Sequence, residues 1–325
     1  MKITVSSIVI AGLLLTPVHF LSTEQPVSAQ TVSNYDAAVK QGEKVKAITS
    51  SLNTSINQGI IKKVNIDYDL LLPEVKKLEE SIGKVSGSTN RKKLEATYLV
   101  PAKVTIERVI YEVSQYRLML LLLDWRYGIG PDAAEYENMM LKLERLKERA
   151  AHIKQTGGYK ELPPAINAEL RKIEAEIQGF IVDFRVDEYN RAMNAGNLAQ
   201  MNEIYDHLTK QVKLAQQRIG KVSGSKNRQK LNDEHVVPAK VIIERSIYEI
   251  SQYRLLNVIS NHIAKGDIES AKQGLGTLER LKERAVKIKE AGGYAPLPQS
   301  IQQNLKAKED SVLAQIKDSE VISIN

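Results

Sequence analysis

The sequence contains no cysteine, and only 5% of its 325 residues are aromatic. The absence of cysteine excludes a disulfide framework, a zinc–thiolate site and a cysteine nucleophile, so packing alone must stabilise the fold. Leu, Ile, Ala, Lys, Glu and Gln are abundant. Because these residues favour helices, the composition predicts an all-α protein.

Long apolar runs are also scarce, and the main one lies near the amino terminus. Residues 8–15 are apolar, and small side chains at Val27 and Ala29 precede Gln30. This pattern is typical of a secretory signal peptide, so we predict that residues 1–29 are cleaved and that the protein is secreted. An uncleaved membrane anchor is the alternative, but the run is short for a span of about 20 residues.

Motifs for catalysis and metal binding are missing as well. The histidines beyond the predicted signal peptide are scattered, no His-Glu-x-x-His motif is present, and no acidic loop has calcium-binding spacing. We therefore predict no catalytic residue, no metal site and no cofactor, and we do not expect an enzyme. Two carboxylates brought together by the fold, as in glycoside hydrolysis, are the enzymatic alternative that the sequence leaves open.

An internal repeat organises the chain. Residues 82–117 match residues 219–254 at 26 of 36 positions, with an offset of 137. Residues 143–159 match residues 278–294 at 13 of 17 positions, with an offset of 135. The sequence therefore predicts two copies of one unit, residues 30–168 and residues 169–325, after the signal peptide.

Helical periodicity runs through both copies. Apolar residues recur at three- and four-residue steps, and Gly157-Gly158 and Gly292-Gly293 are typical of left-handed helix caps. In the second copy we predict helices near residues 164–194, 198–219, 227–264, 268–290 and 298–317. Because the helix near 164–194 closes one unit and opens the next, we predict elongated tandem helical bundles that share a linking helix.

Each copy contains a basic loop without acidic residues. Residues 83–93 and 220–230 each carry four positive charges in eleven residues, with serines and glycines that provide further donors. Such loops bind phosphate or carboxylate groups, and two copies make binding to a repeating polymer multivalent. Alternatively, the glycines only form turns, Ser88 or Asn90 caps the next helix, and the lysines are simply solvated. The predicted polymer-binding residues of the loops are Lys84, Arg91, Lys92, Lys221, Lys226 and Arg228.

The helix after each loop carries a second group of candidate binding residues. Arg108, Glu112 and Gln115 are spaced four and three residues apart, which predicts one stripe with an ion pair between Arg108 and Glu112. Tyr111 and its counterpart Tyr248 lie beside this stripe. A sugar-binding surface needs aromatic faces next to polar groups, so we add both tyrosines to the predicted polymer-binding residues. The alternative is that they anchor the bundle with the hydroxyl at its rim.

Three segments carry a family resemblance. AGNLAQMNEIYDHL, AKGDIESAKQGLGTLERL and IIERSIYEISQYRLL resemble the helical amino-terminal region of SbsC-type S-layer proteins of Gram-positive bacilli. The resemblance implies a rod of helical bundles that attaches non-covalently to an anionic secondary cell-wall polymer through basic and aromatic side chains. The β-sandwich region that builds the lattice in that family has no counterpart here, so the resemblance does not extend to lattice formation.

The formal net charge of +7 agrees with an anionic partner. We expect a secreted, cell-wall- or S-layer-associated protein that binds an anionic secondary cell-wall polymer, and we expect no nucleic-acid partner. The alternative is an extracellular interaction module, such as a helical adhesin or toxin component, whose partner is another surface protein.

Overall fold

The computed structural model describes residues 29–125 and 132–324, which contain α-helices, two short π-helical segments and no β-strand. The all-α prediction is therefore confirmed. The predicted signal peptide lies outside the described residues, except for Ala29. The elements in chain order are α1 (Ala29–Gln58), α2 (Ile61–Gly83), α3 (Ser88–Leu94), η1 (Glu95–Leu99), α4 (Val100–Trp125), α5 (Ala133–Gly157), α6 (Pro164–Asn194), α7 (Leu198–Gly220), α8 (Ser225–Leu231), η2 (Asn232–Val236), α9 (Val237–Ala264), α10 (Ile268–Gly292) and α11 (Gln299–Ile324).

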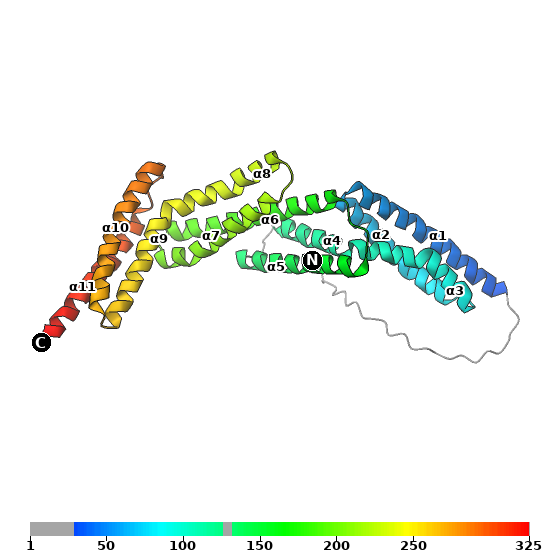
Figure 1. Ribbon diagram of the computed structural model, residues 1–325, viewed down its shortest axis with the longest axis horizontal. Helices are drawn as coiled ribbons and strands as arrows, with labels where there is room; N and C mark the ends of the chain where they lie inside the picture. Colours follow the sequence, from blue (N-terminus) through cyan, green and yellow to red (C-terminus); the bar gives the residue numbers. More distant parts are fainter. Residues whose placement is uncertain (1–28, 126–131, 325) are drawn as a thin grey trace.

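The helices form an elongated array (Figure 1). Its first part packs α1 and α2 against η1 and α4, and its second part packs α4, α5 and α6 together. The third part packs α6 and α7 against η2 and α9, and the fourth packs α9, α10 and α11. The long helices α4, α6 and α9 each contribute to two consecutive groups, so the array is continuous.

The linking helix α6 is apolar on opposite sides. Ile177 and Ile181 belong to the hydrophobic core built mainly by α1–α5, whereas Val182 belongs to the core built by α7–α11. The positions on α1 that match Ile177 and Ile181 are Lys40 and Lys44, and both are exposed. This difference explains why α6 is covered on two sides while α1 is covered on one.

Glycines end two helices as the sequence predicts. Gly158 and Gly293 follow α5 and α10 with φ of +60°, and both adopt the left-handed conformation. The αL conformation carries no Cβ penalty in glycine, so it stops the helix and turns the chain toward the next element.

Each π-helical segment precedes a proline. Residues 95–99 and 232–236 form single wide turns, and Pro101 and Pro238 follow them. A proline ring collides with the carbonyl group four residues earlier in a regular α-helix, and a wider turn relieves this collision. The chain nevertheless continues helically from α3 through α4 and from α8 through α9.

The π-helical segments place a ring against a glycine of the neighbouring helix. A Cβ atom added to Gly42 of α1 would lie 2.5 Å from the ring of Tyr98, and one added to Gly179 of α6 would lie 2.3 Å from the ring of His235. Both pairs occupy matching repeat positions. The absence of a side chain at these glycines allows the close approach.

Among the described residues, no helix is long and apolar enough to cross a membrane.

Candidate functional site

The two basic loops lie apart along the array. Only residues 84–87 and 221–224 of the predicted loops lie between helices, because residues 88–93 and 225–230 belong to α3 and α8. The first basic loop lies near one end of the molecule, and the second lies near the middle (Figure 1). The lysines at 84, 92, 221 and 226 are exposed, and none of them forms an ion pair with a described residue. Arg91 and Arg228 are half-buried. Each donates a hydrogen bond to a carbonyl of its own loop, Arg91 to Val85 at 3.0 Å and Arg228 to Val222 at 2.9 Å. The arginines close the loops, and the lysines are free to meet an anion.

The alternative interpretation, in which a serine or asparagine of the loop caps the next helix, is wrong. Gly87 and Gly224 are the N-cap residues of α3 and α8, and neither helix has a side-chain cap. Asn227 instead donates a hydrogen bond to the Ser223 carbonyl at 3.0 Å. The glycines adopt φ of +86° and +85°, so the loop turns by backbone conformation and leaves the serine hydroxyls outside the cap.

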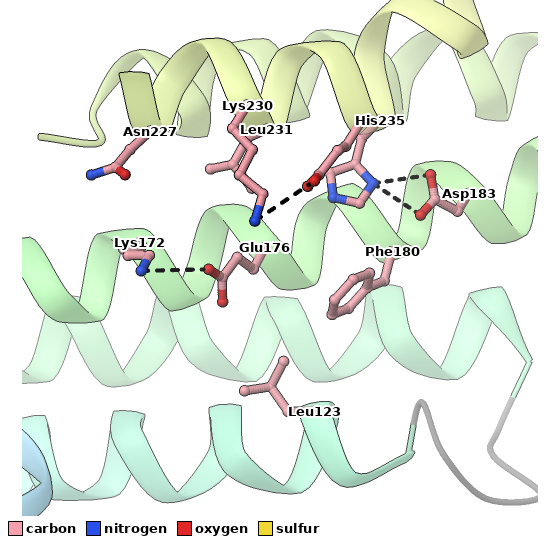
Figure 2. Close-up of a pocket in the computed structure, with 10 residues that line it drawn as sticks. Leu123, Lys172, Glu176, Phe180, Asp183, Asn227, Lys230, Leu231 and His235 are labelled. Atoms are coloured by element: carbon pink, nitrogen blue, oxygen red, sulfur yellow. Dashed lines mark hydrogen bonds and ion pairs between the residues drawn. The ribbon is translucent and has the colours of Figure 1, made fainter. Parts of the chain in front are cut away.

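A hollow of about 700 Å³ lies beside the second loop (Figure 2). Asn227 and Lys230 of α8 line it on one side, and Lys172 and Glu176 of α6 line it on the other. Phe180 belongs to the apolar part of the lining. Both lysines are paired, Lys172 with Glu176 at 4.0 Å and Lys230 with Glu234 at 3.7 Å, and Asp183 adds a further carboxylate. The hollow is therefore partly polar and partly apolar and has no excess of positive charge.

A histidine that sequence reasoning left unassigned lies in this hollow. His235 of η2 is buried, and its Nδ1 atom lies 2.9 Å from a carboxylate oxygen of Asp183 on α6 (Figure 2). Because the carboxylate accepts, Nδ1 carries the proton. The sequence offered one signal, which is that His235 replaces Tyr98 of the first copy. Tyr98 donates instead to Glu43 Oε1 at 2.7 Å.

The predicted ion pair between Arg108 and Glu112 is wrong. Arg108 donates to the carbonyls of Lys160 and Glu161 at 2.8 and 2.7 Å, and Glu112 pairs with Lys154. The carbonyls between α5 and α6 lack helical partners, and the forked guanidinium group satisfies two of them. The second copy repeats this arrangement, because Arg245 donates to Ala295 and Pro296, and Glu249 pairs with Lys289.

The predicted tyrosines are half-buried, and the hollow beside Tyr248 contains no residue of the basic loops. Tyr248 lines a shallow hollow of about 440 Å³ together with Ile247, Ile288 and Tyr294. Tyr294 donates a hydrogen bond to Glu244, which raises the pKa of the tyrosine. Tyr111 is also half-buried, and Tyr159 and Glu107 repeat the tyrosine–carboxylate pair in the first copy. An aromatic face with an adjacent carboxylate fits a sugar ring.

The fold and these surfaces define an elongated array of helical bundles with repeated basic and aromatic surface sites. Residues 21–103 and 134–240 match the family model described as SbsC C-terminal domain, so the chain belongs to this family. The SbsC-type prediction is confirmed, although the description names the C-terminal rather than the amino-terminal part. Membership indicates a surface protein of the S-layer type. No curated protein and no solved structure matches the chain.

The two matched segments end at the same place in the repeat, although the second begins earlier and includes most of α5. They end at Lys103 and Lys240, which are matching positions at the offset of 137. Each segment therefore includes one basic loop, one π-helical segment and the start of the long helix that follows.

Proposed function

We propose that this protein is secreted and binds an anionic cell-wall polymer non-covalently, in a binding rather than a catalytic role. The observation that carries the proposal is the presence of exposed lysines without ion-pair partners in both basic loops, Lys84 and Lys92 in one and Lys221 and Lys226 in the other. The hollow beside the second loop and the shallow tyrosine hollows provide further contact surface. Family membership supports a cell-surface location.

Two separated loops favour a polymeric partner over a small anion. Once one loop holds a polymer chain, the second loop meets the same chain at a raised effective concentration. A single anion gains nothing from the second loop. Binding through exposed lysines is also screened by salt, since the Debye length is about 8 Å at physiological ionic strength.

Reversing the four loop lysines is expected to weaken binding to purified cell-wall sacculi by tenfold or more. The variant is Lys84→Glu, Lys92→Glu, Lys221→Glu and Lys226→Glu, and it replaces attraction by repulsion at both loops, so about 1.4 kcal/mol or more is lost. Co-sedimentation with sacculi at several salt concentrations measures the change.

A matched control has the same change in net charge away from the loops. Lys62, Lys142, Lys213 and Lys287 are exposed and form no ion pair with a described residue. Their reversal to glutamate should reduce binding much less. The proposal fails if the loop variant binds as well as the unchanged protein, or if the control variant loses as much affinity as the loop variant.

A further inference from the structure

Two hollows lie between helices at matching places in the repeat. One of about 320 Å³ lies among α4, α5 and α6, and one of about 640 Å³ lies among α9, α10 and α11. Every residue that lines the smaller hollow has its repeat counterpart in the lining of the larger one. Neither hollow contains a residue of the basic loops or the predicted tyrosines. We call these hollows the seam sites.

The seam sites are polar where packed helices are usually apolar. Glu112 and Glu249 are 3% and 1% exposed, and Gln115 and Gln252 lie beside them with 7% and 5% exposure. Burying a carboxylate costs several kcal/mol even when it is paired, and an apolar side chain of similar volume is often at least as stabilising. Stability alone therefore does not explain why both copies keep a carboxylate and an amide here.

One carboxylate oxygen in the larger seam site has no partner. Oε1 of Glu249 accepts from Lys289 and, at 3.2 Å, from Gln302. Oε2 is buried and accepts no hydrogen bond from the described residues. A buried acceptor without a donor is rare in proteins. The side chain that carries this atom lines the hollow, so a ligand that enters and shifts the side chain can supply the missing donor.

The charges of the seam sites select among ligand classes. Three carboxylates and three lysines line the larger seam site, and Lys282 pairs with Glu309 and Lys306 with Asp310, so no excess charge is left to hold a simple anion or a simple cation. A polyhydroxylated ligand suits this mixture of groups, because a hydroxyl group donates to the carboxylate and accepts from an ammonium or amide group. The volumes lie within the range of small-molecule sites.

We propose that each seam site binds a sugar unit of the polymer through the hydroxyl groups of that unit. Glu112 and Glu249 accept from the sugar, and the side-chain amides of Gln115 and Gln252 donate to it. The inference rests on the proposed function and assigns a different task to each surface. The loops attract the charge of the polymer and respond to salt, whereas the seam sites recognise its sugars and respond little to salt.

Filling the mouths of the seam sites tests this inference. Ala151 and Val286 are exposed lining residues, so Ala151→Phe with Val286→Phe blocks both hollows without entering the core. Calorimetric titration with soluble wall-polymer fragments at high salt, where surface charges are screened, is expected to show at least tenfold weaker binding for this variant. Glu148→Phe with Glu283→Phe places the same two aromatic rings at exposed positions of α5 and α10 outside the hollows and should bind normally.

A second variant tests the carboxylates themselves. Glu112→Gln with Glu249→Gln keeps the shape but removes the charge, and it should weaken binding in the same high-salt titration; a thermal melt shows whether it still folds. If blocked and unchanged proteins bind equally at high salt, or if binding occurs only at low salt, the seam sites are refuted while the proposed function stands. If fragments and sacculi fail to bind the unchanged protein at any salt concentration, the proposed function itself is refuted.

Discussion

Replacing Glu174 by alanine is expected to lower the free energy of unfolding by about 3 kcal/mol. The side chain of Glu174 is 9% exposed and lies on α6, where it accepts from Lys147 of α5 at 3.0 Å and from Arg218 of α7 at 2.9 Å. Without the carboxylate, two cations remain close together in a partly buried place. Among the described residues, Arg218 then keeps only Glu144, at 3.1 Å, and its buried Nη1 atom has no partner there.

The second copy supplies a matched comparison. Glu309 occupies the position of Glu174 but is 18% exposed and pairs with Lys282 alone. Glu309→Ala should therefore cost about 1 kcal/mol, as expected for a partly exposed pair. Urea denaturation followed by circular dichroism measures both variants. Equal losses of unfolding free energy would show that the ion pair between Arg218 and Glu174 does not stabilise the packing of α7 against the preceding helices.

Much of the fold follows from local rules. The predicted helix near residues 164–194 is α6, and the predicted helix at 227–264 covers most of α8, η2 and α9, which together run from residue 225 to residue 264. Apolar periodicity and glycine caps fix such elements because both act within a few residues. The π-helical segments were not predicted, since a widened turn depends on a proline and on the ring packed against the next helix.

Local rules predicted the hydrogen-bond and ion-pair partners of the side chains less well. Residues 108 and 112 have the spacing of a helical ion pair, but the free carbonyls of a turn more than 50 residues away attract Arg108 more strongly. His235 and Asp183 are 52 residues apart, so no spacing rule brings them together. The predicted basic loops were too long, because residues 88–93 and 225–230 belong to α3 and α8, and only the structure separates the solvated lysines from the arginines that bond to the loop carbonyls.

Replacing Gly179 by alanine is expected to destabilise the protein by about 1–3 kcal/mol, which is the usual cost of overpacking a well-packed site. The sign is informative, because alanine normally stabilises a helix interior by up to about 1 kcal/mol relative to glycine. In α6 the new Cβ atom would lie 2.3 Å from the His235 ring, which is itself held by Asp183. Either the ring or the helix must move.

Two comparisons isolate the contact with the ring. Gly276 of α10 has no atom within 4 Å of an added Cβ, so Gly276→Ala should stabilise the protein by up to about 1 kcal/mol. Removing the ring by His235→Ala should abolish most of the cost of Gly179→Ala, and a double-mutant cycle measured by urea denaturation gives their coupling. If Gly179→Ala stabilises the protein as much as Gly276→Ala does, the ring does not lie against this glycine. Because Gly42 and Tyr98 repeat the pair in the first copy, Gly42→Ala should show the same sign, and opposite signs would limit the close approach to one copy.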